Sequence, residues 1–336
     1  MPNKLISALT KSLLLVPASI GGWLAYSRLI VNHSQLLPPA INAPRRTFVG
    51  NRLNRSMSYY MDTSTSGRPL VLIHSINAAA SAYEMRPIFE YYRTRRPVFA
   101  LDLPGFGFSE RSDTDYSPRV YADSIRDFLD EVPGEAPDVI ALSLGSEFAA
   151  WAALEEPDRI HSLTMISPSG FTPREQKVSS QRAGESKTGD RVYEILSNPF
   201  WSQAFYDLLT TKAGIRYYLK KSFVGLLDEG LVDYDYRTSH QPGARYAPLY
   251  FVSGKLFTRD VRSEVYAKLD LPVLVIYDRD SFVRFDTLPE FASTRPNWHL
   301  ARVAPTLGLP QFENMDRVAE ELDRFWSEVT VIPSEI

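Results

Sequence analysis

A serine at position 143 stands in a sequence context that favours nucleophilic chemistry. The mostly apolar segment Asp138–Leu142 predicts a buried strand and Ser146–Glu155 predicts a helix, so Ser143 falls in the turn between them. Small residues, Ala141 and Gly145, stand two positions before and after it, as a tight turn of this kind requires. Such a turn exposes the hydroxyl at the amino end of the helix, where the helix dipole favours negative charge. The pattern predicts a nucleophile elbow; the alternative interpretation is an ordinary strand-to-helix turn that contains a serine.

A serine hydroxyl at neutral pH needs a positioned base to take its proton, and histidine is the usual base. The chain contains five histidines. His161 and His299 open predicted strands, at the end opposite to the elbow, and His33 lies in an N-terminal connector. His74 follows a strand at the correct end of the sheet, and His240 lies in a later helical segment from which its side chain can reach down. We therefore keep His240 as the candidate base, with His74 as the alternative.

The elements that position these residues alternate between short apolar runs and helical patterns. Two short strands, 46–50 and 57–61, are predicted to form a hairpin. The longer apolar runs are 69–74, 98–103, 138–142, 161–167, 271–277 and 298–303, and the helical patterns are 80–92, 119–131, 146–155 and 315–326. This alternation predicts an α/β fold with a mainly parallel sheet covered by helices on both sides. Ligands in such sheets bind beyond the carboxyl ends of the strands, where Ser143 is expected.

One long segment interrupts the alternation, and we expect three regions in the chain. Residues 171–268 carry many Phe and Tyr residues at helical spacings and predict a helical cap inserted into the core. The α/β core is then formed by residues 46–170 and 269–336, and residues 1–45 form an apolar segment with a proline-containing connector. An aromatic cap is consistent with a small apolar or ester substrate, although such residues also serve simply to hold the cap on the sheet.

The N-terminal segment 12–31 is mostly apolar and is long enough to cross a bilayer, which takes roughly 20 residues. Three interpretations are open: a membrane anchor, a cleaved signal peptide, or a helix docked on the protein itself. Basic residues lie on both sides of the segment, so its orientation is not predicted. We expect membrane association through this segment.

Composition excludes several other classes of function. The net charge is −3 and no run of Lys and Arg appears, which argues against a nucleic-acid partner. The absence of cysteine excludes disulfides, thiolate catalysis and cysteine-ligated metals. The histidines form no closely spaced pair, so no metal site is predicted, and no motif predicts a cofactor. Nothing in the sequence predicts an oligomeric state.

From about residue 46 to residue 326 the chain resembles the α/β-hydrolase family. The segment His74–Asn77 matches the family's oxyanion loop, with Ser75 where glycine is usual. The resemblance implies that the backbone N–H groups of Ile76 and Leu144 hold the oxyanion. It also implies that the acid is Asp280 rather than Asp278. A further match, Asp102–Ser109, shapes a loop in the family.

The resemblance fails at the position of the catalytic histidine. The segment from Leu309 to Asn314 resembles the end of the family's last motif, and on that alignment Gly308 stands where the histidine belongs. Loss of a triad member removes most of the rate but leaves about 10³–10⁴-fold over water. Three functions follow as hypotheses: a serine hydrolase for esters or acyl lipids with a weakened or unconventional triad, an inert member that binds an apolar ligand or partner under its cap, or an acyltransferase.

Overall fold

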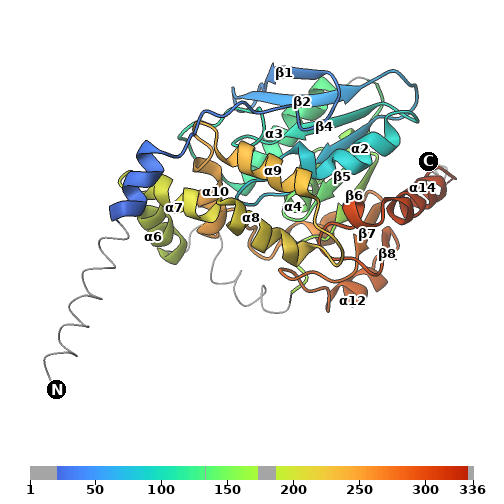
Figure 1. Ribbon diagram of the computed structural model, residues 1–336. Helices are drawn as coiled ribbons and strands as arrows, with labels where there is room; N and C mark the ends of the chain where they lie inside the picture. The colour runs from blue at the N-terminus through green and yellow to red at the C-terminus, as the bar shows by residue number, and fades with distance from the viewer. Residues whose placement is uncertain (1–20, 133, 173–186, 332–336) are drawn as a thin grey trace, which may run out of the picture.

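The computed structural model describes residues 21–132, 134–172 and 187–331. Within these ranges eight strands form one sheet in the order β1-β2-β4-β3-β5-β6-β7-β8 (Figure 1). The first pairings, β1 with β2 and β2 with β4, are antiparallel, and all later pairings are parallel. The strands are β1 (Arg45–Val49), β2 (Ser56–Asp62), β3 (Leu70–Ile73), β4 (Val98–Asp102), β5 (Asp138–Leu142), β6 (Ser162–Ile166), β7 (Val273–Tyr277) and β8 (Trp298–Arg302). The predicted α/β class is therefore confirmed.

Helices cover both faces of the sheet, and each face has its own apolar core. Along β3, Val71 and Ile73 belong to one core, and Leu70 and Leu72 belong to the other, because successive strand residues point to opposite faces. The first core is completed by α3 (Pro118–Glu131), α4 (Gly145–Glu155) and α12 (Leu288–Ser293), and the second by α2 (Arg86–Tyr92) and α14 (Met315–Val331). Burial of the central strands on both sides explains why their sequences are continuous apolar runs.

Shorter elements lie in the loops of this core. They are the 3₁₀ turns η1 (Ala82–Met85) and η2 (Pro157–Arg159), and the one-turn helix α13 (Pro310–Glu313). The first follows the loop after β3, and the last follows the loop after β8. Both loops lie beyond the carboxyl ends of parallel strands, at the same end of the sheet as the turn after β5.

The helices inserted between β6 and β7 form the cap. They are α6 (Lys187–Leu196), α7 (Ser202–Leu209), α8 (Lys212–Leu219), η3 (Lys220–Ser222), α9 (Glu229–Ser239), α10 (Tyr246–Val252), α11 (Val261–Glu264) and η4 (Tyr266–Lys268). Many of the cap aromatics are buried, including Tyr206, Tyr234 and Tyr266. The cap is held to the core by specific contacts, such as the hydrogen bond from the Tyr206 hydroxyl to the Ala78 carbonyl, 2.7 Å long.

The described part of the N-terminal segment is a helix over residues 21–29 that lies beside α7 (Figure 1). The Trp23 indole donates to the Ala204 carbonyl at 2.7 Å, and the Ser27 hydroxyl donates to Asp207 at 2.5 Å. A docked helix is thus the correct interpretation for residues 21–29. The rest of the predicted apolar segment, residues 12–20, lies outside the described residues. Within the described ranges, no helix combines the length and apolarity needed to cross a membrane.

The connector from the N-terminal helix to β1 is attached to the core. Leu37, Ala40 and Ile41 are buried in the second core, and the Ala40 N–H donates to the Tyr60 hydroxyl at 2.9 Å. The connector therefore fixes the chain between the N-terminal helix and the core, where it contacts β2.

Candidate active site

Ser143 occupies a strained turn between β5 and α4. Its φ is +50°, a backbone conformation that costs free energy for a residue with a side chain. The turn is held in place because the Ser143 N–H donates to the Ile166 carbonyl of β6 at 2.8 Å. Ser143 itself is half-buried. These features are those of a nucleophile elbow, which displays a hydroxyl at the rim of the sheet.

The small residues on either side of Ser143 have separate structural roles. Ala141 is fully buried, and its carbonyl accepts a hydrogen bond from the Ser146 hydroxyl at 3.0 Å, which ties the strand to the first turn of α4. A Cβ on Gly145 would overlap the carbonyl oxygen of His74. Glycine at position 145 therefore lets the elbow lie directly against the loop after β3.

The two predicted oxyanion donors lie on different elements, Ile76 on the loop after β3 and Leu144 at the start of α4. No hydrogen bond in the described structure uses the backbone N–H of Ile76 or of Leu144. Leu144 is the N-cap of α4, so its N–H lies at the positive end of the helix dipole. This arrangement is compatible with binding an oxyanion, and that role stays a prediction.

A buried carboxyl group, that of Glu84, holds the loop after β3 through hydrogen bonds. Glu84, on η1, accepts hydrogen bonds from the Ser75 N–H and the Ser75 hydroxyl, both at 2.9 Å, and from the Asn77 amide at 2.8 Å. The Glu84 backbone carbonyl also accepts from the Gln311 amide of α13 at 3.0 Å. Burial raises the pKa of the Glu84 carboxyl to about 7. The sequence analysis missed Glu84, because no motif marks a lone glutamate as the support of a loop nine residues earlier.

His74 has a structural role and does not serve the elbow as a base. Its ring is fully buried, with Nε2 accepting from the Leu103 N–H at 2.9 Å and Nδ1 beside the Ser75 carbonyl at 2.6 Å. Burial lowers the pKa of His74 to about 4. With both ring nitrogens used to join two loops, His74 cannot accept the Ser143 proton without breaking them.

The two candidate acids, Asp278 and Asp280, both lie on the loop after β7 but make different contacts. Asp278 is buried and binds Arg302 Nε at 2.8 Å and the Thr306 N–H at 3.0 Å, so it fixes the segment after β8. Asp280 shapes its own turn, because its Oδ1 accepts from the Phe282 N–H at 2.7 Å and the Val283 N–H at 3.3 Å. Asp280 thus remains the candidate for an orienting acid.

Gly308 lies directly against Asp280. A Cβ built on Gly308 would be 2.7 Å from Asp280 Oδ2 and 3.6 Å from the Cβ of Ser222. An acid that orients a catalytic histidine must contact that histidine's ring, so position 308 is where such a histidine would stand. This proximity supports the alignment that makes Gly308 the vacated histidine position.

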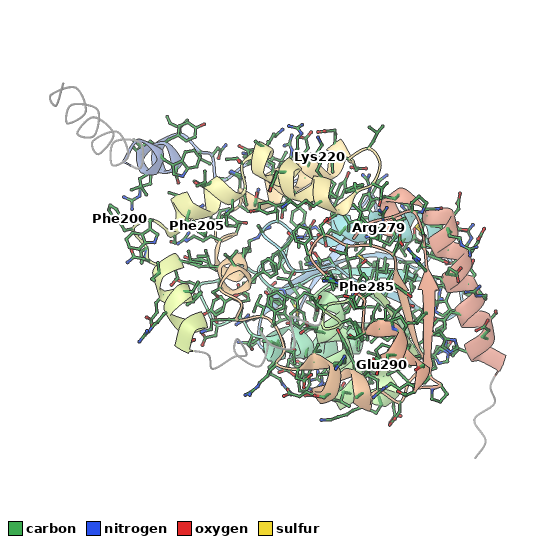
Figure 2. All side chains as sticks on the ribbon, turned by 90° about the horizontal axis from the view of Figure 1, so that it is seen from below. Phe200, Phe205, Lys220, Arg279, Phe285 and Glu290 are labelled. Atoms are coloured by element: carbon green, nitrogen blue, oxygen red, sulfur yellow. The ribbon has the colours of Figure 1, made fainter. Side chains whose placement is uncertain are left out.

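Cap residues 221–225 cover this part of the site. The Ser281 hydroxyl donates to the Lys221 carbonyl at 2.7 Å. Glu313 of α13 accepts from the Val224 N–H at 2.6 Å and, through its other oxygen, from the Leu307 N–H at 2.8 Å. The cap, the Asp280 loop and the loop that carries Gly308 are therefore one hydrogen-bonded unit. Figure 2 shows Lys220 and Arg279 on the same side of the molecule.

His240 lies in a different environment from the one that a catalytic base needs. It is the C-cap residue of α9; Nδ1 lies 2.6 Å from the Tyr236 carbonyl, and its ring stacks on that of His33 with centroids 6.1 Å apart. None of its described interactions is with Ser143. Burial also lowers the pKa of His240. The described contacts of His240 therefore join the cap to the N-terminal segment and give no support to the predicted role as base.

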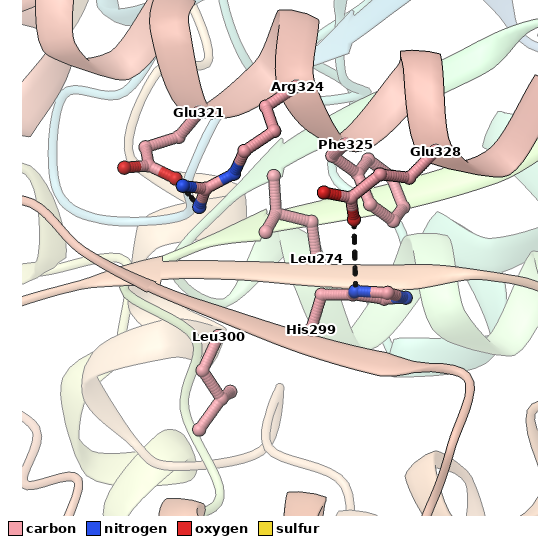
Figure 3. Close-up of a pocket in the computed structure, with 7 residues that line it drawn as sticks. All are labelled: Leu274, His299, Leu300, Glu321, Arg324, Phe325 and Glu328. Atoms are coloured by element: carbon pink, nitrogen blue, oxygen red, sulfur yellow. Dashed lines mark hydrogen bonds and ion pairs between the residues drawn. The ribbon is translucent and has the colours of Figure 1, made fainter.

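His299 lies in a separate surface pocket. It stands near the start of β8, opposite α14, in a cavity of about 230 Å³ (Figure 3). Its Nδ1 is 3.8 Å from Glu328 Oε2, and the apolar part of the lining is formed by Leu274, Leu300 and Phe325. Leu274 and His299 are register partners near the amino ends of β7 and β8. This pocket is consequently at the opposite end of the sheet from Ser143.

The fold and the strained turn together define a class of protein, an α/β protein with a serine at the strand-to-helix turn after a central strand. The family model described as the alpha/beta hydrolase family matches residues 70–321. This chain belongs to the alpha/beta hydrolase family.

Individual relatives match shorter stretches of the chain. The 1-acylglycerol-3-phosphate O-acyltransferase ABHD5 of Mus musculus is 30% identical over 143 residues, which cover 41% of this chain and 40% of that protein. The 2-hydroxymuconate semialdehyde hydrolase of Pseudomonas sp. (strain CF600) is 31% identical over 111 residues, 32% of this chain and 39% of that protein. The chain thus matches about two fifths of the length of these curated relatives.

Solved structures resemble the chain over much more of its length. A membrane phospholipase A, described as a bacterial virulence factor, has a TM-score of 0.68 at 19% identity and covers 99% of this chain and 100% of its own. A serine hydrolase involved in carbazole degradation has a TM-score of 0.65 at 15% identity, covering 84% of this chain and 99% of its own. At these identities the likeness shows the fold alone.

Proposed function

We propose that this protein is a membrane-associated serine hydrolase for esters of apolar acyl groups, acting through a triad weakened by the loss of its base. The observation that carries the proposal is the contact between Gly308 and Asp280. The turn at Ser143 has the backbone geometry of a nucleophile elbow, and the position beside the candidate acid has no side chain. The chain therefore keeps the parts that bind and polarise an ester and has lost the part that moves the proton.

The chemistry that such a site performs follows from its parts. The Ser143 oxygen attacks the ester carbonyl, and the N–H groups of Ile76 and Leu144 stabilise the negative charge on the carbonyl oxygen. The Ser143 proton must leave for this step, and without an imidazole it passes to water. Removal of triad members leaves about 10³–10⁴-fold acceleration over water from oxyanion stabilisation and binding. Slow turnover with intact binding is the expected behaviour.

The class of substrate is supported by the cap and by the relatives. Buried aromatic side chains of the cap face the core, and a site beneath an aromatic cap suits an apolar acyl group. One relative is named as a 1-acylglycerol-3-phosphate O-acyltransferase, and one structural neighbour is named as a membrane phospholipase A. The apolar N-terminal segment supports the membrane association.

Two other functions share the same site. An acyltransferase is favoured by the name of the ABHD5 relatives, and it differs only in that an alcohol replaces water as the acyl acceptor. A binding protein without turnover is favoured by the vacated position at Gly308. Both alternatives use the same Ser143 site as the hydrolase, so one set of variants distinguishes the three functions.

The decisive experiment restores the missing base. We expect Gly308→His to raise esterase activity on a p-nitrophenyl acyl ester, and the rate of labelling by a fluorophosphonate probe, by about 10²-fold or more. Gly308→Ala, which adds the Cβ without the imidazole, is the matched control and should give no gain. The Asp280 carboxylate is the end of a flexible side chain, so it can move to admit the new Cβ at 2.7 Å.

Ser143→Ala sets the baseline for these measurements. Activity of the natural chain above that baseline supports a slow hydrolase, and activity equal to it supports the binding protein. Transfer of the acyl group to an added lysophospholipid, rather than to water, would identify the acyltransferase. A Gly308→His variant that folds but gains nothing would show that more than the base is missing.

A further inference from the structure

The exposed apolar side chains of this protein are concentrated on the cap and the N-terminal helix. Of the 16 large apolar side chains exposed in the described residues, 14 lie between residues 26 and 36 or between residues 192 and 252. On the core only Val49 and Phe282 belong to this set. Scattered exposed apolar residues are ordinary, but concentration on one part of a molecule marks an interaction surface.

Four of these residues, among them the most exposed one, lie in one short segment, residues 217–226, which we call the cap edge. Leu226 is 96% exposed, and Tyr217, Tyr218 and Val224 are about half exposed. Figures 1 and 2 show the N-terminal helix, α7 and α8 in a row along one side of the molecule, with Lys220 at its outer surface. Tyr26, Leu29 and Ile30 are exposed on the N-terminal helix in the same row.

The cap edge also carries two positive charges, on Lys220 and Lys221. Neither Lys220 nor Lys221 takes part in an ion pair among the described residues, and Lys221 Nζ lies 4.3 Å above the Tyr217 ring. By contrast, Arg216 is paired with Glu229 at 2.6 Å. Tyrosine beside lysine, next to exposed aliphatic side chains, is a composition that suits the interface of a membrane.

The cap edge is continuous with the candidate active site. Ser222 faces Gly308, and Glu313 accepts the backbone N–H groups of Val224 and Gly225 at 2.6 and 3.0 Å. The same carboxylate group holds Leu307, one residue before Gly308. A surface bound at the cap edge would therefore lie beside the site that receives the ester.

We propose that the cap edge docks into the interfacial region of an anionic lipid bilayer, so that acyl lipid reaches Ser143 directly from the membrane. Two features favour a bilayer over a protein partner: the unpaired lysines, and the apolar segment 12–20 that leads into the exposed N-terminal helix. The inference rests on the membrane association within the proposed function, and adds to it a second contact far along the chain from the N-terminal segment.

The absence of cysteine makes a site-specific test direct. The full chain carrying Leu226→Cys is labelled with an environment-sensitive nitrobenzoxadiazole group and mixed with vesicles of phosphatidylcholine, with and without phosphatidylglycerol. We expect a blue shift of the label and quenching by nitroxide-bearing lipids, both stronger with phosphatidylglycerol. The matched control is Val49→Cys, an exposed apolar position on β1 of the core, where no change is expected.

Charge reversal tests the role of the lysines. Lys220→Glu and Lys221→Glu, introduced together, should weaken the apparent affinity of the labelled segment for phosphatidylglycerol vesicles by more than about 25-fold, because the lost attraction alone is worth about 5-fold per lysine and each glutamate adds repulsion. Flotation with vesicles, measured on the same samples, reports association through any part of the chain.

Each other outcome overturns the proposal in a distinguishable way. Flotation without a change at position 226 leaves membrane association intact and refutes docking of the cap edge. If the protein does not float with the vesicles, both membrane association and docking of the cap edge are refuted. A change at position 226 that appears without vesicles as protein concentration rises assigns the surface to a second copy of the chain, and an equal change at position 49 shows unspecific adsorption.

Discussion

At the scale of single residues, the candidate site depends on two glycines and one strained serine. Ser143 keeps a φ of +50° because its N–H is held by β6 and because Gly145 allows the adjacent loop to lie against the turn. Because Gly308 has no Cβ, the Asp280 carboxylate can lie directly against its backbone. The first glycine is required by close approach of backbone atoms, and the second stands where the proposed function places a lost histidine.

Gly145→Ala tests the close approach. Its Cβ would overlap the His74 carbonyl, a backbone atom that cannot rotate away, so the elbow and the loop must separate. We expect a loss of about 1–3 kcal/mol in the free energy of unfolding, measured by chemical denaturation. Gly225→Ala, where nothing lies within 4 Å of the new Cβ, should cost little. Equal stability of the two variants would refute the packing argument.

At the scale of elements, a buried carboxylate of the cap joins the N-terminal helix to α7, in addition to the hydrogen bonds that Trp23 and Arg28 donate to cap carbonyls. Asp207 of α7 accepts from the Ser27 hydroxyl at 2.5 Å and the Gln203 amide at 2.8 Å, and it lies 2.9 Å from His33 Nε2. His33 in turn stacks on His240 at the end of α9. Residues 21–33 are thereby joined to two cap helices by polar contacts, while Leu29 and Ile30 remain exposed.

Asp207→Asn should release this helix. The amide offers one acceptor oxygen where the carboxylate offers two, and its NH₂ group would face other donors. We expect hydrogen–deuterium exchange over residues 21–33 to accelerate about 10-fold or more, since a buried charge-assisted network contributes at least 1–2 kcal/mol. Asp233→Asn, which removes an exposed pair with Lys212, is the control and should leave this exchange unchanged. No acceleration in Asp207→Asn would mean that the other contacts hold the helix, including the hydrogen bonds from Trp23 and Arg28 to cap carbonyls.

At the scale of the whole molecule, buried acidic groups link the oxyanion loop, the last core loop and the cap. Glu84 holds Ser75 and Asn77, its carbonyl binds Gln311, and its carboxyl is close enough to the buried Asp235 of α9 to interact with it electrostatically. Burial raises the pKa of Asp235 as well. Ionisation of the Glu84 and Asp235 carboxyl groups is therefore unfavourable, and the charge of the core residue influences that of the cap residue.

Glu84→Gln should show this coupling as a pH dependence of stability. The pKa of Glu84 rises from an ordinary value of 4.5 to about 7 on folding, so the folded state binds the proton more tightly between these values. The free energy of unfolding of the natural chain, relative to the variant, should therefore fall as pH rises from 4.5 to 7, by about 3 kcal/mol at most. Denaturation measured across this range checks the prediction.

The control for this measurement is Glu229→Gln, at the exposed start of α9. Because Arg216 lowers the pKa of Glu229, no comparable fall is expected above pH 4.5. If the difference in free energy of unfolding between the natural chain and Glu84→Gln stays constant up to pH 8, the prediction is wrong. The buried carboxyl would then be ionised at little cost.

Several features followed from the sequence because they are set by local patterns. Continuous apolar runs predict strands buried on both faces, and the eight strands lie within a few residues of the predicted ranges. The elbow was recognisable because strand, small residues and helix are adjacent in the chain, and the mismatch at Gly308 because a motif surrounds it. The family membership and the fold were predicted on this basis and are confirmed.

Contacts between distant segments were decided only by the tertiary structure. The surroundings of Glu84, the placement of His240 beside His33, and the covering of Gly308 by Ser222 join residues far apart in the chain. A side chain's neighbours across a fold depend on the angles between packed elements, which a single sequence does not specify locally. The residue types therefore determined which chemistry the chain can attempt, and the packing of cap on core decided which of those residues meet.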